Sequence, residues 1–328
     1  MSLELLHAAL RRFTVEHATP AVRDGAEAGA FPAALWQAAE DAGFTRPFAS
    51  GGWAEAGAIV QAAGRDALPV PMAESIAASW LLEQVGIEPP PGLLTLGEGE
   101  IELARSEVTG NLWRVPWGGD ASHVVAEAAG ELVLIPCPNL PMVFESNLAG
   151  EPRVSLVLDR RPCTLGTDRI APGTVRRLGA AMRALQMAGA MSAALELAVE
   201  YANTRVQFGK PIAKFQAIQQ NLAAMAVEVA AASAAAEGAL SAIGETGFEF
   251  WAAAAKSRCG DAAGQAAAQA HAVFGAIGFT HEHALHRLTR RLWSWRAEFG
   301  SERYWNRELG RAALARGADN LWPDLTLR

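Results

Sequence analysis

The spacing of apolar residues changes twice along the chain. Up to about residue 90, apolar positions recur every three or four residues, and Leu35, Ala38 and Ala39 lie on one face of the string Phe31–Phe44. This period is that of an amphipathic helix, and Gly43 is a typical residue just past a helix end. The N-terminal zone therefore predicts several short helices.

Between residue 91 and about residue 170, alanine becomes rarer and β-branched residues increase. Two short apolar runs, Val124–Glu127 and Glu131–Ile135, flank a tight turn at Ala129-Gly130. Arg153–Asp159 alternates apolar and polar side chains. Alternation with a period of two predicts strands, and short strands joined by tight turns are typical of antiparallel sheets. We expect a small β domain in this zone.

From residue 171 the pattern is helical again. Leu178–Asn203 is long and rich in alanine, and Gly209 and Pro211 interrupt the pattern after it. The next helix carries apolar residues at steps of three and four, namely Ile218, Leu222, Met225, Val229, Ala232, Ala236, Leu240 and Ile243. Such a narrow apolar stripe suits packing between long antiparallel helices.

These patterns predict a fold that is mostly α with a small β domain. Its parts are an N-terminal helical domain over residues 1–90, a middle antiparallel β domain over residues 91–170, and a C-terminal up-and-down four-helix bundle over residues 171–328.

Composition narrows the classes of function. Apolar residues make up 51% of the 328 residues and charged residues 19%, so the chain can bury a large core. The formal net charge of -7 argues against nucleic-acid binding, which needs a basic surface. The apolar runs are broken by charges and the N-terminus lacks a long apolar segment, so we expect no membrane span and no signal peptide.

Cysteines and histidines give no pattern of a disulfide framework or a metal site. The three cysteines are far apart and form no CxxC pair. His281, His283 and His286 lie two and three residues apart, which is not the spacing of four that places two ligands together on a helix. We expect no metal, and a reducing, cytoplasmic setting.

The string Tyr201–Ala226 lies between two predicted long helices. Arg205 is fixed near a helix end, and Gly209 allows close approach of the backbone. A guanidinium group binds diphosphates through two parallel hydrogen bonds, so this string could hold a phosphate-bearing cofactor. The alternative is a capped interhelical loop in which Phe208 and Phe215 anchor the core.

The string Phe274–Arg291 contains a Gly-x-x-Gly turn before a predicted helix. Thr280 is placed to cap that helix at its N-terminus, and exposed amides there could face a phosphate or a flavin edge. The alternative is a plain turn between two helices.

Together the two strings resemble the C-terminal domain of the acyl-CoA dehydrogenase family. The first matches that family at Tyr201, Arg205, Gln207, Phe208, Gly209, Pro211, Ile212 and Phe215–Gln219. The second matches it at Gly275, Gly278, Phe279, Thr280, Glu282 and His283, while Ala272 and Ala276 replace a glutamine and a glycine. Leu35–Gly43 and Gly64-Arg65, followed by Pro69 and Pro71, extend the resemblance to the N-terminus.

The resemblance implies a flavoprotein that binds FAD and dehydrogenates an acyl-CoA thioester. In that family, a glutamate removes the α-proton, and a hydride passes from the β-carbon to the flavin. Members usually form tetramers in which a neighbouring subunit supplies part of the FAD site. The cofactor-binding residues implied here are Arg205, Gln207, Phe208, Gln216, Ala272, Gly275 and Ala276.

Both family positions for the catalytic glutamate hold other residues. One position matches Phe299 and the other matches Gly179, and neither side chain accepts a proton. Glu298 and Glu302 flank the first position and are substitute candidates for the base. The alternative is that both are solvated surface carboxylates.

The middle domain also departs from the family. It lacks the Thr-Glu-Pro-x-x-Gly-Ser and Trp-Ile-Thr strings that contact the flavin ring in that family. Trp113 and Trp117 lie in the corresponding zone, either as ring contacts or as buried aromatic anchors.

Three functions therefore remain open. The first is an acyl-CoA dehydrogenase that works on its own. The second is a catalytically silent or half-site subunit of a hetero-oligomeric dehydrogenase, since the sequence resembles the heterotetrameric branch of bacterial steroid side-chain degradation. The third is a helical assembly protein without a cofactor.

Overall fold

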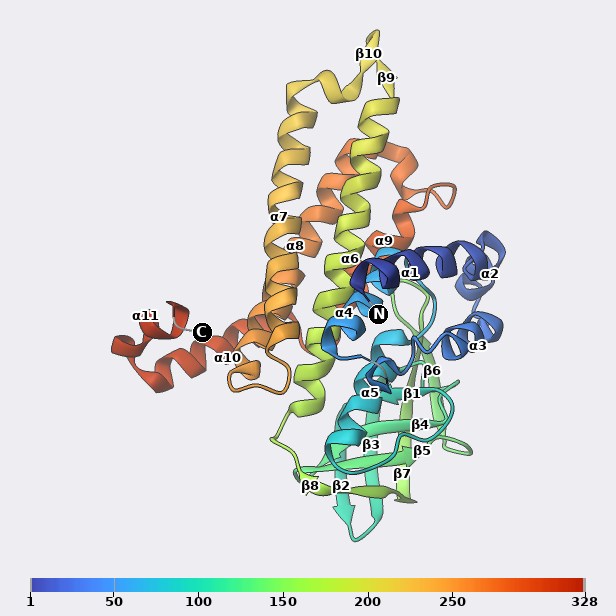
Figure 1. Ribbon diagram of the computed structural model, residues 1–328, viewed down its shortest axis with the longest axis vertical. Coiled ribbons are helices and arrows are strands. Elements are labelled where there is room, and N and C mark those ends of the chain that lie inside the picture. The colour runs from blue at the N-terminus through green and yellow to red at the C-terminus, as the bar shows by residue number, and fades with distance from the viewer. Residues whose placement is uncertain (1, 50, 327–328) are drawn as a thin grey trace. The chain divides into compact units, whose positions relative to one another are not determined.

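The computed structural model describes residues 2–49 and 51–326, and the chain divides into two compact units (Figure 1). The first unit contains the residues up to Ala63 and Leu68–Met182. The second contains Gly64–Ala67 and the chain from Arg183 onward. The division into three domains at residues 90 and 170 stays a prediction from the sequence.

The first unit begins with helices, as the N-terminal pattern predicts. They are α1 (Leu3–His17), α2 (Pro20–Glu27), α3 (Ala33–Asp41), the 3-10 turn η1 (Pro47–Ala49), α4 (Trp53–Arg65) and α5 (Met72–Gln84). Ser2 and Thr19 cap α1 and α2, because their hydroxyls accept hydrogen bonds from free backbone amides of the first turn. Helix α5 is buried on nearly every side, so it forms the centre of this helical layer.

Two four-stranded sheets follow these helices. The strands are β1 (Leu94–Leu96), β2 (Gly99–Ala104), β3 (Glu107–Pro116), β4 (His123–Ala128), β5 (Glu131–Pro136), β6 (Met142–Ser146), β7 (Pro152–Pro162) and β8 (Thr164–Arg169). One sheet has the order β1-β4-β5-β8 and the other β2-β3-β7-β6. Their pairs are antiparallel except β1 with β4, which is parallel. In β7, Val154, Leu156 and Leu158 are buried, as the alternation predicts.

The second unit is helical. Helix α6 (Thr174–Thr204) runs into it from the first unit. The elements after α6 are β9 (Val206–Gln207), β10 (Lys210–Pro211), the 3-10 turn η2 (Ile212–Lys214), α7 (Gln216–Ser241), α8 (Phe248–Phe274), the 3-10 turn η3 (Gly275–Phe279), α9 (Leu285–Trp295), α10 (Glu302–Arg316) and α11 (Ala318–Thr326). Long helices with short connections confirm the predicted α-helical C-terminal part (Figure 1).

The predicted apolar stripe of the second long helix packs against α8. Four of its predicted members are buried within α7, namely Met225, Val229, Ala232 and Ala236, and Ala239 is buried beside them. Among the described residues, α7 alone is long and apolar enough to cross a membrane, with a mean hydropathy of 1.3 over its 18-residue window and 28% of that window buried. One such helix is weak evidence for a membrane span, because core helices of soluble proteins share this composition.

The expected helix start at Thr280 is wrong. Residues Gly275–Phe279 form a 3-10 turn, and α9 begins only at Leu285. Gly278 is buried in that turn, where an added Cβ would lie 2.9 Å from Cβ of Phe274. The Thr280 hydroxyl therefore donates back to the carbonyl of Ile277 (2.9 Å) instead of accepting from a helix amide.

Candidate functional site

The string around Arg205 forms a two-stranded hairpin beyond the end of α6. The amide of Arg205 donates to the carbonyl of Tyr201 (2.8 Å), and the amide of Ile212 donates to the carbonyl of Arg205 (2.9 Å). Phe208 and Gly209 form the turn, with φ values of 51° and 76°. Positive φ at both turn residues matches the twist of a short hairpin, which explains why glycine follows Phe208.

The side chains of this hairpin face solvent. Phe208 is 92% exposed, so it is not the core anchor of the alternative interpretation. The Arg205 side chain is exposed and has no hydrogen-bond or ion-pair partner within residues 2–49 and 51–326. An unpaired guanidinium on a hydrogen-bonded hairpin is suited to an anion from outside the chain.

Two strings that are 70 residues apart meet at one end of the second unit (Figure 1). The ring of Tyr201, one turn before Arg205, stacks on Phe274 with centroids 4.4 Å apart. The amide group of Asn221 donates to the carbonyl of Gln269 (3.0 Å), which joins the start of α7 to the end of α8. The Arg205 hairpin and the Gly275 turn therefore belong to the same end of the bundle.

The Gly275 turn is open at its surface. Gly275 has a φ of 65°, and a Cβ added there would meet no atom within 4 Å. The other predicted cofactor-binding residues, Gln207, Gln216, Ala272 and Ala276, are all exposed. An open backbone turn and an unpaired guanidinium at the same end of the unit fit a diphosphate-bearing cofactor such as FAD.

The three histidines near this turn make local contacts. Nδ1 of His283 accepts from the amide of Leu285 (3.1 Å), and Nδ1 of His286 lies 2.7 Å from the carbonyl of His283. The ring of His281 lies edge-on to His286 with centroids 4.8 Å apart. Their failure to bind a metal stays a prediction.

The residue that the sequence matches to the family position of the catalytic base is a buried aromatic ring. Phe299 is 7% exposed, and the guanidinium of Arg183 lies 5.6 Å from its ring centroid. Its carbonyl accepts a hydrogen bond from Nε1 of Trp305 (3.0 Å). Gly179, the other position, is buried on α6 and offers no functional group. Neither position provides a proton acceptor.

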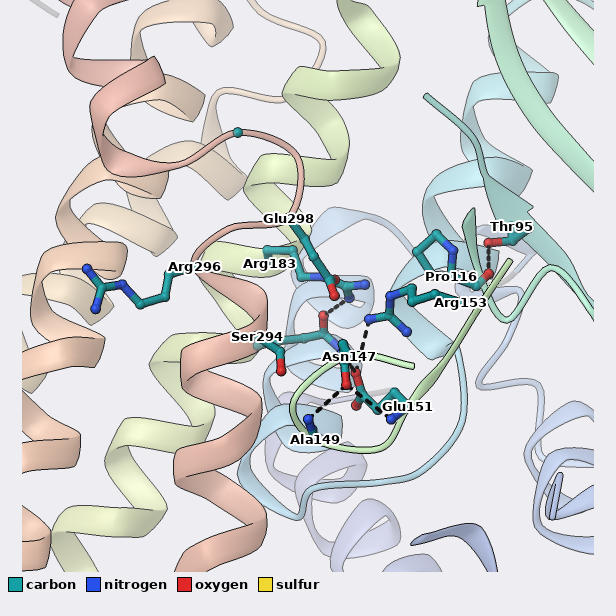
Figure 2. Close-up of polar contacts among 12 residues, drawn as sticks. Thr95, Pro116, Asn147, Ala149, Glu151, Arg153, Arg183, Ser294, Arg296 and Glu298 are labelled. Atoms are coloured by element: carbon teal, nitrogen blue, oxygen red, sulfur yellow. Dashed lines mark hydrogen bonds and ion pairs between the residues drawn. The ribbon is translucent and has the colours of Figure 1, made fainter. Parts of the chain in front are cut away.

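The two substitute carboxylates are both engaged by arginines. Figure 2 shows the first of them, Glu298, beside Arg183. Oε2 of Glu298 accepts from Nε of Arg183 at 2.8 Å, with the two side chains 16% and 2% exposed. Arg183 also donates to Gln186. Glu302 forms an ion pair with Arg296. Glu298 is thus a partly buried counterion of Arg183 and not the solvated surface carboxylate of the alternative interpretation. The sequence offered the same residue as a substitute for the catalytic base.

Lys256 on α8 holds the loop that contains Phe299, a role that the sequence did not reveal. Its side chain is fully buried, and Nζ donates to the carbonyls of Arg296 and Gly300, both at 2.7 Å. Burial lowers the pKa of Lys256 to about 8, although the nearby carboxylates of Glu302 and Glu298 oppose the shift. The feature of the sequence that could have indicated this role is the single lysine within the alanine-rich run of α8.

Lys256→Met should change how stability depends on pH. The folded pKa of about 8 lies below the ordinary value of 10.5, so the unfolded chain binds more protons between these values. As the pH rises from 7 to 9.5, the free energy of unfolding of the wild-type chain should therefore increase by about 2 kcal/mol relative to that of the variant. Urea unfolding at both pH values measures this difference. The exposed Lys214→Met is the control, and equal pH profiles of wild type and Lys256→Met would refute the assignment.

The two tryptophans of the middle zone differ in burial. Trp117 is 4% exposed, and its ring lies edge-on to Phe31 with centroids 6.0 Å apart. It is an aromatic anchor of the first unit, whereas Trp113 is 48% exposed. Nearby in the same unit, Arg153 and Glu151 form a buried ion pair (3.1 Å) that fixes the loop before β7 (Figure 2).

Comparison with known proteins agrees with these structural features. The profile of the acyl-CoA dehydrogenase C-terminal domain matches residues 175–314. Acyl-CoA dehydrogenase IpdE2 of Mycobacterium tuberculosis is 31% identical over 251 residues, which cover 74% of this chain and 72% of that protein. The chain belongs to the acyl-CoA dehydrogenase family.

Solved structures show the same fold along nearly the whole chain. The ChsE4-ChsE5 complex from Mycobacterium tuberculosis has a TM-score of 0.86 at 21% identity, covering 96% of this chain and 98% of that chain. A Tcur3481-Tcur3483 steroid ACAD variant also has a TM-score of 0.86 at 21% identity, covering 97% and 98%. These similarities confirm the predicted fold class of N-terminal helices, a middle β region and C-terminal helices.

Proposed function

We propose that this chain is an FAD-holding subunit of a hetero-oligomeric acyl-CoA dehydrogenase and that it lacks a catalytic base of its own. The observation that carries the proposal is the environment of Phe299. A buried ring stands at one base position, a glycine stands at the other, and Arg183 engages the neighbouring Glu298. A carboxylate held by a buried guanidinium is a poor proton acceptor, because the ion pair favours its charged form.

The exposed end of the second unit would hold the cofactor. Arg205 would bind the FAD diphosphate, and the open turn at Gly275 would allow backbone approach to the rest of the nucleotide. When bound, FAD supplies the hydride acceptor of the reaction. Phe208 and Arg205 lie uncovered in the single chain, and this supports a site that a second subunit completes.

The partner would be another acyl-CoA dehydrogenase-like subunit that carries the glutamate. A solved relative with the same fold is a complex of two named chains, ChsE4 and ChsE5, which supports this arrangement. The substrate would be an acyl-CoA thioester. The description of a second relative as a steroid ACAD supports a bulky, ring-bearing acyl group.

Two other functions compete with this proposal, and different observations argue against each. A dehydrogenase that works alone would need a carboxylate free to remove the α-proton, and both candidates near Phe299 are ion-paired. A cofactor-free assembly protein would leave the unpaired Arg205 without a role. Purified protein that contains no flavin, alone or with a partner, would support that function and exclude our proposal.

Arg205→Ala should weaken FAD binding by about 10- to 100-fold, because a charge-assisted hydrogen bond contributes about 1.5–3 kcal/mol. Flavin fluorescence titration of the apoprotein, or of its complex with the partner, measures the dissociation constant. The exposed Arg12→Ala on α1 is the matched control and should bind like wild type. An unchanged dissociation constant for Arg205→Ala would refute the assigned role of this arginine.

A further inference from the structure

The ring of Phe274 is held between two other rings at the end of the second unit that carries Arg205 and Gly275. Tyr201 stacks on it with centroids 4.4 Å apart, and His283 lies tilted against it with centroids 4.5 Å apart. Phe274 is 4% exposed and is the last residue of α8, directly before Gly275. These rings therefore connect the end of α6, which leads to Arg205, with both sides of the Gly275 turn.

The His283 side chain also fixes the residue with which α9 begins. Its Nδ1 accepts a hydrogen bond from the backbone amide of Leu285 at 3.1 Å. This amide is the first of α9 and has no carbonyl partner inside the helix, so it depends on a group from outside the helix. The side chain of Leu285 is fully buried, and its Cδ2 lies 3.1 Å from the position of a Cβ added at Gly278. His283 thus fixes Leu285, and Leu285 packs on the turn.

Only the neutral form of the His283 ring can make this hydrogen bond. Because Nδ1 accepts, the ring carries its proton on Nε2. A protonated ring has N–H groups on both nitrogens, so two donors would face each other across the 3.1 Å between Nδ1 and the Leu285 amide. Protonation of His283 therefore breaks the bond to Leu285.

The groups around His283 favour its neutral form. Burial lowers the pKa of this ring below its ordinary value of 6.5, and His286 on α9 lowers the pKa further, while Glu200 on α6 opposes the shift. From α8 the ring is faced by the uncharged Phe274. The stability that the neutral ring contributes is therefore present above about pH 6.5 and is lost as the pH falls through the lowered pKa.

We propose that His283 is a positioning residue that holds the Gly275 turn in place for the cofactor while its ring is neutral and releases the turn when the ring is protonated. It acts through Phe274 and Leu285 and not by touching the cofactor. The inference rests on the proposed function, because that function assigns FAD binding to the turn and to Arg205. Acid pH should loosen the turn and, as a consequence, weaken FAD binding.

Two substitutions separate the hydrogen bond of His283 from its ring contact. His283→Asn keeps an acceptor, because the side-chain oxygen of asparagine accepts from the amide two residues later and does not titrate. His283→Phe keeps an aromatic ring beside Phe274 but has no acceptor at any pH. The asparagine variant should therefore behave like the neutral histidine, and the phenylalanine variant like the protonated one.

Amide hydrogen exchange of residues 275–286 in the FAD-free protein measures the turn itself. Each exchange rate is divided by the intrinsic rate at the same pH, and the resulting protection is compared between about pH 7.5 and about pH 5.5, on either side of the ordinary histidine pKa. Wild-type protection should fall by about 3- to 10-fold at the lower pH, which is the change in equilibrium that one neutral hydrogen bond produces. Protection in His283→Asn should be the same at both pH values, and in His283→Phe it should be low at both.

The dissociation constant of FAD is the second readout, measured by flavin fluorescence at the same two pH values on the apoprotein or its complex with the partner. It should increase by about 3- to 10-fold at the lower pH in wild type and stay constant in His283→Asn. His123→Asn in the first unit is the matched control, because burial also lowers the pKa of that ring. It should keep the wild-type pH dependence of both readouts. His271, which stacks on Phe279 of the same turn, is present in every variant and so cannot cause a difference between them.

Three results would overturn the proposal. These are an equal loss of protection at acid pH in wild type and His283→Asn, an FAD dissociation constant that increases equally in both, and wild-type protection in His283→Phe at neutral pH. Circular dichroism spectra that match wild type show that the variants are folded. If no protein in the series binds FAD at either pH, the proposed function is contradicted, and the exchange difference between wild type and His283→Asn alone decides whether His283 holds the turn.

Discussion

Glu298→Gln should lower the free energy of unfolding by about 3 kcal/mol, because it removes the charge of the carboxylate that pairs with the buried guanidinium of Arg183. Arg183 is 2% exposed, and its Nε lies 2.8 Å from Oε2 of Glu298. The amide of a glutamine keeps a hydrogen-bond acceptor but removes the compensating charge. Urea unfolding followed by circular dichroism measures the change.

A double substitution separates the charge effect from packing. Arg183→Met together with Glu298→Gln removes both charges and should be more stable than Glu298→Gln alone. The matched control is Glu196→Gln, which breaks the exposed pair with Arg65, whose side chains are 59% and 42% exposed. It should cost less than about 1 kcal/mol. If Glu298→Gln also lowered the free energy of unfolding by less than about 1 kcal/mol, the charge of Glu298 would not be what stabilises its pair with Arg183.

Gly64→Ala should destabilise the chain by about 3 kcal/mol, because two backbones touch at this glycine. A Cβ at residue 64 would lie 2.2 Å from the carbonyl oxygen and 2.6 Å from Cα of Gln186 on α6. The backbone of Gln186 cannot rotate away from the new methyl group as a flexible side chain would. The two helices must therefore move apart. Thermal and urea unfolding measure the loss.

Gly310→Ala is the control for helix propensity. Gly310 lies within α10, and an added Cβ there would meet nothing within 4 Å. Alanine should stabilise this helix by up to about 1 kcal/mol. If Gly64→Ala behaved like Gly310→Ala, close contact between Gly64 and α6 would be refuted.

The close approach at Gly64 also explains a feature of the sequence. Gly64-Arg65 was part of the N-terminal resemblance, where its physical role was not visible. The structure assigns the glycine to contact with Gln186 and the arginine to the ion pair with Glu196. Both contacts join segments more than 100 residues apart, which local patterns do not reveal.

The spacing of apolar residues was sufficient to predict most of the helices and strands. The strands predicted from the apolar runs at Val124–Glu127 and Glu131–Ile135 are confirmed by β4 and β5, and the long helices of the second unit lie where their apolar stripes predict. These patterns are strong because the apolar side of each helix or strand packs on another element. The start of α9 was mispredicted, because burial of Gly278 in a tight turn outweighs the capping preference of Thr280.

The environment of the missing base could be predicted only in part. The motif match predicts that Phe299 stands where the family has a glutamate, and this stays a prediction. It did not show that Arg183, 115 residues earlier than Glu298, holds that carboxylate, or that Lys256 holds the loop. Sequence spacing carries no information on such long-range pairs. The cofactor residues around Arg205 stay predictions, supported by exposure and by an unpaired guanidinium.

The α9–α10 loop is therefore fixed from three helices. Arg183 on α6 holds Glu298, Lys256 on α8 holds two carbonyls, and Trp305 on α10 holds the carbonyl of Phe299. These contacts hold Glu298 in its ion pair with Arg183. This is the structural basis for assigning the base to a partner subunit.

The most direct test of that assignment is the visible spectrum of the flavin under anaerobic conditions during titration with acyl-CoA thioesters. The panel extends from short straight acyl chains to ring-bearing ones. We expect no bleaching when this chain is the only protein present. We expect bleaching when a homologous, glutamate-bearing subunit is co-purified with it. Bleaching of the flavin by an acyl-CoA in this chain alone would contradict the account.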